Sequence, residues 1–357
     1  MYILDEVLSG SVRVKASDVH FTVGRPPVYR VDGQLDPIEG EALSPEMMEK
    51  LLMPLIDVRH RAQLQENGQT DFAYAISGVG RFRVNVFKQR GTLAAAMRCL
   101  PFGIPEPGSL GIPSEVVEMT TRKRGLVLVT GPTGSGKSTT LASLIHEINK
   151  KYCYHIITLE DPIEYLHRHD RSIVNQREIG SDSMDYAQAL RAALREDPDV
   201  ILVGEMRDLE TISTAITAAE TGHLVFSTLH TTGADQTLDR IIDVFPPDQQ
   251  QQIRIQLASV LECIVSQQLL RRADGQGRVS ALEVLFANNA IRNLIREGKT
   301  YQIPSVMQTS KRLGMQTMDD ALYDLYMRKI IDADEAVTYA QDPVSMNKKV
   351  TFDLPDF

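Results

Sequence analysis

The sequence predicts an α/β protein that carries a smaller α+β domain at its N-terminus. In the second part of the chain, short apolar runs alternate with helical patterns, which is typical of a mostly parallel sheet covered on both faces. In the first part, alternating strand patterns are mixed with short helices instead. With 357 residues and 43% hydrophobic residues, the chain is long and apolar enough to bury two cores.

The elements of the smaller domain begin with a helix. Residues 2–8 place Ile3, Leu4, Val7 and Leu8 on one helical face. Ser44 and Pro45 provide an N-cap and a first-turn proline for a second helix. Strand patterns occupy residues 16–24, 26–33, 71–76, 81–90 and 93–100, and the second of them ends in a turn at Asp32 and Gly33.

Residues 101–113, PFGIPEPGSLGIP, separate the two parts. Prolines and glycines are too frequent there for a helix or the interior of a sheet, so we expect a linker. The expected domains are therefore residues 1–100 and 114–357.

The larger domain alternates strands with helices. Strands are expected over residues 125–130, 155–160, 199–204 and 223–229, and helices from Ser138, over 186–195 and over 209–220. From about residue 235 the signal is mostly helical, with one strand over 278–286. The last residues, from Met346, are expected to form a loose tail.

A glycine-rich motif, GPTGSGKS, stands between the first of these strands and its helix. Glycines allow successive backbone N–H groups to point inward, and the N-terminus of the helix adds positive potential. This context predicts a phosphate loop that binds ATP or ADP, with Lys137 on the β- and γ-phosphates and Ser138 on Mg²⁺. The alternative is a glycine turn with a solvated lysine. The expected nucleotide-binding residues are Gly131, Pro132, Thr133, Gly134, Ser135, Gly136, Lys137, Ser138 and Thr139.

Acidic residues follow two of the other strands. Glu160 ends HIITLE, and Glu205 comes directly after DVILVG. Because parallel strands present their carboxyl ends to the ligand, we expect both beside the phosphate loop. Glu205 is assigned as the base, and Glu160 as a partner of the water or, through water, of Mg²⁺. Gly204 stands where an aspartate often binds the metal, so Ser138 is left to hold it. The alternative for either acid is a cap on the following segment.

Two histidines bracket the strand HLVFSTLH. His230 is expected at its carboxyl end, where it could sense the γ-phosphate, and His223 stands at its start. The alternative is a pair of hydrogen-bonded histidines near a sheet edge.

Arginines are concentrated in the smaller domain. Arg81, Arg83, Arg90 and Arg98 fall within eighteen residues, and the strand period sets Arg81 and Arg83 on one face. One reading is a basic strand that discourages edge pairing. The other is an arginine finger that reaches the γ-phosphate of its own or an adjacent subunit.

Composition limits the remaining classes. The net charge of −9 supplies no general basic field for nucleic acid. Three isolated cysteines favour neither a disulfide framework nor a cysteine zinc site, and a reducing cytoplasm fits. Asp5 and Glu6 stand where a signal peptide needs positive charge, and we see no apolar run of membrane-spanning length. We therefore expect a soluble protein that reaches a membrane only through partners.

Four motifs together resemble those of the secretion ATPases of the type II and type IV pilus superfamily. They are GPTGSGKSTTL, ITLEDPIEY, LRAALREDPDVILVGEMRD and TAAETGHLVFSTLHT. Within this superfamily, ASDVHF, PPVYRVDG, RFRVNVFKQR and AIRNLIREGK resemble the pilus retraction ATPases, the PilT family. Assembly ATPases typically carry a longer N-terminal region and a four-cysteine zinc motif, which this sequence lacks.

The resemblance implies a RecA-like ATPase core, a PAS-like N-terminal domain and a helical C-terminal region. It also implies a homo-hexamer at the cytoplasmic side of a bacterial inner membrane, where a pilus platform protein and the pilus machinery are its partners. Glu205 would be the Walker B glutamate, Glu160 the acidic-box glutamate, and His223 with His230 the histidine-box pair. Arg81, Arg83 and Arg98 are the arginines implied to reach a neighbour's phosphate.

Two other functions remain open from the sequence. A nucleotide-gated accessory module would change its grip on a partner with little turnover. A RecA-like translocase would act on nucleic acid, but aromatic residues do not alternate with basic ones as such a site needs.

Overall fold

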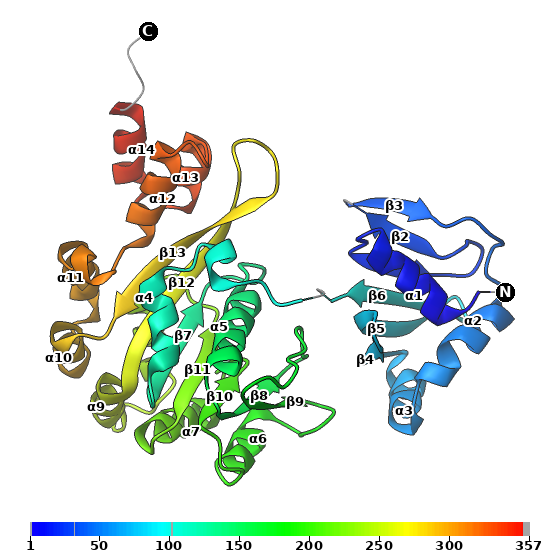
Figure 1. Ribbon diagram of the computed structural model, residues 1–357, viewed down its shortest axis with the longest axis horizontal. Helices are drawn as coiled ribbons and strands as arrows, with labels where there is room; N and C mark the ends of the chain where they lie inside the picture. The colour runs from blue at the N-terminus through cyan, green and yellow to red at the C-terminus, as the bar shows by residue number, and fades with distance from the viewer. Residues whose placement is uncertain (1, 32, 101–102, 353–357) are drawn as a thin grey trace. The chain divides into compact units, whose positions relative to one another are not determined.

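The computed structural model describes residues 2–31, 33–100 and 103–352, which fall into two units of residues 1–103 and 104–357 (Figure 1). Asp32 of the expected turn and residues 101 and 102 of the expected linker lie outside the described residues. Farther along the linker, Pro107–Leu110 form one short 3-10 helix.

The N-terminal unit is a six-stranded antiparallel sheet with helices on one face. The strand order is β3-β2-β1-β6-β5-β4. Apolar side chains of the helices pack against alternate residues of the strands, for example Leu8 and Leu52 with Phe82 and Val84. The elements are α1 (Leu4–Arg13), β1 (Asp18–Phe21), β2 (Val28–Val31), β3 (Gln34–Pro37), α2 (Pro45–Leu52), α3 (Val58–Asn67), β4 (Gln69–Ile76), β5 (Gly80–Gln89) and β6 (Thr92–Cys99).

The expected start of the second helix is confirmed. Ser44 caps α2, since its hydroxyl accepts a hydrogen bond from the backbone N–H of Met47, and Pro45 occupies the first turn. The sequence patterns missed β3, whose four residues are all exposed, and α3, which buries one residue, Leu64. Both lack the apolar periodicity that identifies an element.

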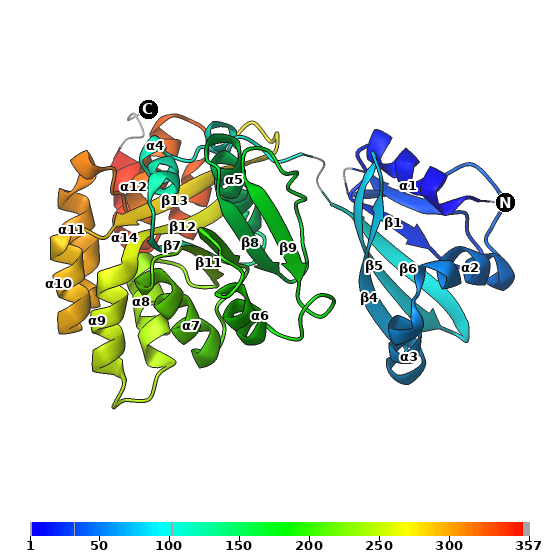
Figure 2. The same ribbon diagram turned by 60° about the horizontal axis from the view of Figure 1, so that its bottom comes forward.

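The second unit contains a seven-stranded sheet with helices on both faces, as the sequence predicts (Figures 1 and 2). Strands β7 (Gly125–Thr130), β8 (His155–Glu160), β9 (Ile173–Glu178), β10 (Val200–Val203), β11 (Leu224–Leu229) and β12 (Leu261–Arg271) are parallel, and β13 (Arg278–Phe286) is antiparallel to β12. The order is β13-β12-β7-β11-β10-β8-β9.

The two faces of this sheet are covered by two separate apolar clusters. On one face pack α4 (Ser114–Val117) and α5 (Lys137–Lys151). On the other face pack α6 (Tyr186–Ala193), α7 (Leu209–Glu220), α8 (Ala234–Asp243), α9 (Gln250–Val260), α10 (Asn289–Glu297) and α11 (Ile303–Thr309). A third cluster joins β12 and β13 to α12 (Met318–Met327), α13 (Ala333–Tyr339) and α14 (Pro343–Phe352).

Two strands of this unit were not predicted, and one expectation was wrong. Residues 261–271 form a long strand, β12, within the stretch expected to be mostly helical, and the sequence patterns also missed β9. The expected loose tail from Met346 is helical as far as Phe352, because Met346 and Val350 are buried in the third cluster. Residues 353–357 lie outside the described residues.

The topology gathers the candidate site at one edge of the sheet. Strands β7, β11, β10 and β8 are parallel neighbours, so the segments that follow them meet at the same edge. Among the helices that the structure describes, none has the length and apolar character to cross a lipid bilayer.

Candidate active site

The glycine-rich motif forms a tight loop between a fully buried strand and a helix. β7 ends at Thr130, and α5 begins at Lys137. The backbone φ angles of Gly131 and Gly136 are 141° and 90°, a region that side chains rarely adopt. A Cβ atom on Gly131 would lie 2.2 Å from the backbone oxygen of Gln267, so glycine is required there. The loop leads into a helix N-terminus, where anions bind favourably.

The Lys137 side chain folds back over this loop. Its Nζ donates hydrogen bonds to the carbonyl oxygens of Gly131 and Pro132, at 2.9 and 3.0 Å. The residue is 8% exposed, and burial lowers the pKa of its ammonium group, although nearby Glu205 and Glu164 act in the opposite direction. Hydrogen bonds to charged acceptors are stronger than those to carbonyls, so phosphate oxygens can displace the two carbonyl oxygens.

The residues of the loop fit a phosphate group and its metal. Ser135 Oγ is buried and, among the described residues, has no hydrogen-bond partner. Ser138 is exposed in the first turn of α5, where its hydroxyl is accessible to Mg²⁺. Thr139 Oγ1 lies 2.9 Å from the Tyr165 hydroxyl, which ties the loop to the segment after β8.

Glu205 follows β10 after a single glycine and is held by two basic side chains. Its Oε2 lies 2.7 Å from Nη2 of Arg207, and its Oε1 lies 3.2 Å from Nε2 of His230. Burial raises the pKa of the Glu205 carboxyl, but the hydrogen bond and charge of Arg207 together with the contact of His230 outweigh burial, and the pKa is lowered. Glu205 is therefore a carboxylate at neutral pH.

Glu160 ends the neighbouring strand β8. Its Oε1 accepts hydrogen bonds from Thr158 Oγ1 at 2.6 Å and from Gln176 Nε2 at 3.0 Å. A Cβ atom on Gly204 would lie 3.0 Å from the backbone oxygen of Leu159, the residue before Glu160, and 2.8 Å from the Tyr186 hydroxyl. The glycine before Glu205 thus lets the two acid-bearing segments lie side by side.

The two histidines lie at opposite ends of β11. His230 contacts Glu205 at the edge that carries the phosphate loop. His223 precedes the strand, and its Nδ1 lies 2.9 Å from the backbone oxygen of Ala218. An extended strand of this length separates the two by roughly 20 Å. The structure brings His230 into contact with Glu205 but leaves His223 at the other end of the strand.

Arg81 and Arg83 of the N-terminal unit share one face of its sheet, as predicted. Arg81 and Arg83 alternate with buried Phe82 along β5. Arg83 is directly opposite Arg98 of β6, whose Nε lies 3.1 Å from Asp18 Oδ1. Arg83 and Arg98 are exposed, so the sheet presents a basic face.

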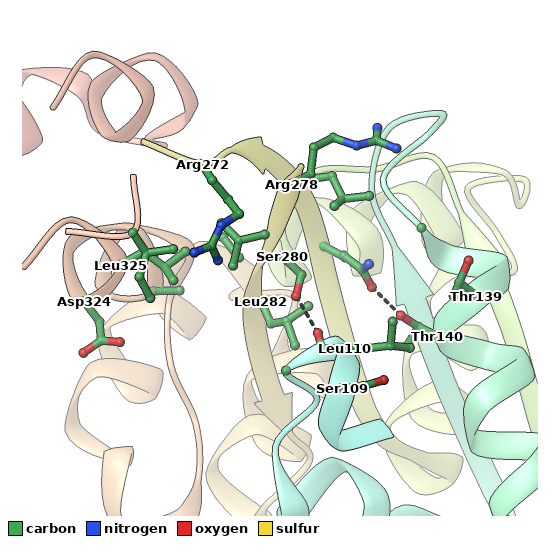
Figure 3. Close-up of a pocket in the computed structure, with 18 of the residues that line it drawn as sticks. Ser109, Leu110, Thr139, Thr140, Arg272, Arg278, Ser280, Leu282, Asp324 and Leu325 are labelled. Atoms are coloured by element: carbon green, nitrogen blue, oxygen red, sulfur yellow. Dashed lines mark hydrogen bonds between the residues drawn. The ribbon is translucent and has the colours of Figure 1, made fainter. Parts of the chain in front are cut away.

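A cavity of about 620 Å³ lies beside the first turn of α5 (Figure 3). Thr139 and Thr140 of α5 form one side, and Asp324 and Leu325 of α12 lie on the other. Gly108–Gly111, β12 and β13 complete the wall. Because the lining includes residues of the phosphate loop and α5, the cavity is continuous with the site.

Comparison with known proteins identifies the family. The sequence model of the type II/IV secretion system protein family matches residues 1–318 of the chain. The chain belongs to this family. The resemblance seen in the four motifs is thus confirmed.

Two relatives and one solved structure are similar to the chain over most of its length. The type IV pilus retraction ATPase PilT of Pseudomonas aeruginosa is 45% identical over 340 residues, which cover 95% of this chain and 98% of that relative. A twitching motility protein of Neisseria gonorrhoeae is 48% identical, covering 90% of this chain and 86% of that relative. The crystal structure of the pilus retraction motor PilT with bound ADP has a TM-score of 0.91 at 53% identity, covering 98% and 99%.

Two residues that contact this site were not predicted from the sequence. Arg207 stands two residues after Glu205 in a segment without helix. Residues at that spacing in an extended chain face the same side, so the sequence GEMRD could have predicted the contact between Glu205 and Arg207. Gln267 contacts the phosphate loop from β12, and the sequence carried no signal for it because β12 itself was not predicted.

Proposed function

We propose that this chain is a Mg²⁺-dependent ATPase motor that couples ATP hydrolysis to retraction of a type IV pilus, and hence to twitching motility. The observation that carries the proposal is the gathering of the phosphate loop, Glu205, Glu160 and His230 at one edge of one sheet. Its support is the near full-length similarity to pilus retraction ATPases at 45% and 53% identity.

The phosphate loop binds ATP through its backbone N–H groups and Lys137. Lys137 exchanges the carbonyl oxygens of Gly131 and Pro132 for phosphate oxygens, which places its charge on the β- and γ-phosphates. Mg²⁺, when bound, neutralises charge on the same phosphates. Ser138 is the side chain that would hold it, and Glu160 would act on it through a water.

Glu205 orients and deprotonates the attacking water. To accept that proton, the carboxylate gives up its contact with Arg207 or His230. His230 directly follows β11, the strand next to β7, so it can respond to the γ-phosphate and pass that response to Glu205. The nucleoside extends from the α-phosphate past Thr139 into the neighbouring cavity.

The cation that completes the site comes from the basic face of an N-terminal unit, and we assign it to Arg81, Arg83 or Arg98 of an adjacent subunit. An arginine finger of this kind accelerates hydrolysis on the order of 10³-fold or more. If each site is completed by the next subunit in head-to-tail order, a closed ring completes every site, and the homo-hexamer expected from the resemblance is such a ring.

Mixed rings test this sharing. Of Arg81→Ala, Arg83→Ala and Arg98→Ala, the variant that removes the finger should lower ATP turnover on the order of 10³-fold while ATP affinity stays within about threefold, because the arginine contacts the phosphate mainly as the bond breaks. Mixing that variant with Lys137→Ala protein should restore part of the activity, since some interfaces then combine an intact arginine with an intact phosphate loop. Arg13→Ala, at the end of α1, is the control for loss of a charge. Mixtures that stay inactive at every ratio contradict shared sites.

The ring acts at the cytoplasmic face of the bacterial inner membrane, which it reaches through the pilus platform protein. Deleting the gene tests the direction of the motor. Cells without the protein should carry surplus pili and lose twitching, and wild-type protein, but not Glu205→Gln, should restore both. Counting pili by electron microscopy checks the result. Cells that lack pili would assign the motor to assembly instead.

A further inference from the structure

Two polar residues in the middle of β12 are almost completely buried beside the phosphate loop. Ser266 is 1% exposed and Gln267 is 5% exposed. The family's motifs quoted above do not include this strand. Buried polar groups are costly unless they are hydrogen-bonded, so the bonds of these two side chains indicate what they hold.

Gln267 is hydrogen-bonded to residues on both sides of Lys137 in the sequence. Its Nε2 donates to the backbone oxygen of Ser135 at 2.6 Å, inside the loop. Its Oε1 accepts from Thr140 Oγ1 at 2.7 Å, in the first turn of α5, a bond drawn in Figure 3. A Cβ atom on Gly136 would lie 2.9 Å from the same Nε2. The side chain thus fixes the loop to the helix at the point where the phosphates bind.

Ser266 holds a different segment. Its Oγ accepts a hydrogen bond from the backbone N–H of Gly233 at 2.8 Å and lies 2.7 Å from Thr130 Oγ1. Gly233 follows His230 by three residues and has a φ of 128°. Ser266 therefore connects the residue before the phosphate loop with the segment that carries His230.

We propose that Ser266 and Gln267 are positioning residues for ATP hydrolysis, and this inference rests on the proposed function. Gln267 keeps the phosphate loop in its binding shape, whereas Ser266 keeps His230 in place against Glu205. The hydrogen bonds of the two side chains go to the phosphate loop, α5, the end of β7 and the segment after β11, so each residue acts through the segment that it holds. The two therefore affect different steps: Gln267 governs nucleotide binding, and Ser266 governs turnover.

The experiment on Gln267 measures nucleotide binding. Gln267→Leu removes both hydrogen bonds and leaves the Ser135 carbonyl unsatisfied, so we expect the Kd for a fluorescent ATP analogue to rise about tenfold. Gln267→Glu keeps the size and the acceptor for Thr140 but cannot donate to Ser135, and it should weaken binding similarly. Gln268→Leu is the matched control, because Gln268 contacts the exposed oxygen of Tyr339 at 3.4 Å instead. Thermal unfolding of each protein without nucleotide reports folding.

The experiment on Ser266 measures ATP turnover. Ser266→Ala leaves the buried Gly233 N–H without its acceptor, and we expect kcat to fall about tenfold while KM and the analogue Kd stay within about twofold. Hydrogen exchange of the Gly233 amide should become faster. Thr130→Val removes the neighbouring hydroxyl but keeps the bond from Gly233, so it should retain kcat within about threefold.

The outcomes separate this inference from the function on which it rests. A wild-type protein without ATP turnover would overturn the proposed function. The role of Gln267 would be overturned if the wild type is active but both Gln267 variants, when folded, bind nucleotide as tightly as Gln268→Leu does. A Ser266→Ala variant with the kcat of Thr130→Val would overturn the role of Ser266.

Discussion

Lys137→Ala will lose ATP binding, with the Kd rising on the order of 10²-fold or more. The ammonium group is buried and its present acceptors are two carbonyl oxygens, so its charge is available to phosphate oxygens. Hydrogen bonds to charged groups each contribute about 1.5–3 kcal/mol, and two of them account for this change in Kd. Isothermal titration calorimetry with ATP measures it.

Lys150→Ala is the matched control for this experiment. Lys150 lies on the same helix, but its Nζ contacts Glu106 at 2.7 Å on the surface. Exposed ion pairs contribute little, so we expect unchanged ATP affinity. An affinity of Lys137→Ala within threefold of the wild type would remove this lysine from the phosphate site.

Glu205→Gln will bind ATP normally and turn it over on the order of 10²- to 10⁴-fold more slowly. The amide keeps the shape of the side chain but cannot accept the proton of the attacking water. The effect falls on chemistry because Glu205 contacts Arg207 and His230 rather than the phosphate loop. Glu210→Gln on α7, whose carboxylate pairs with Arg191 at the surface, should leave turnover unchanged.

The sequence predicted the part of the site that follows from strand ends. Each of β7, β8, β10 and β11 is a short apolar run. Glu160 ends its run, His230 directly follows its run, Glu205 follows after one glycine, and Lys137 follows after the glycine-rich loop. Parallel pairing then places them at one edge, whatever the detailed packing. The same rule separates His223 from the site, because it precedes its strand instead of following it.

The part contributed by β12 could not be predicted in this way. Ser266 and Gln267 interrupt an apolar stretch that continues directly from α9, so the pattern resembled a longer helix. Their polarity is explained only by contacts with Ser135 and Gly233, which are distant in sequence. Periodicity reports burial along one element and carries no information on such partners.

The basic face of the N-terminal unit could be predicted only in part. Alternation along β5 predicted that Arg81 and Arg83 share a face, and the structure confirms it. Their alignment with Arg98 depends on the pairing register of β5 and β6, which a single sequence does not specify.

The most direct test of the account is single-turnover cleavage of bound ATP by Glu205→Gln, with bound nucleotide counted in the same sample. The account predicts wild-type occupancy of the site, and cleavage slowed on the order of 10²-fold or more. Cleavage at the wild-type rate by a fully occupied variant would contradict it, because the carboxylate at the end of β10 would then have no part in activating the water.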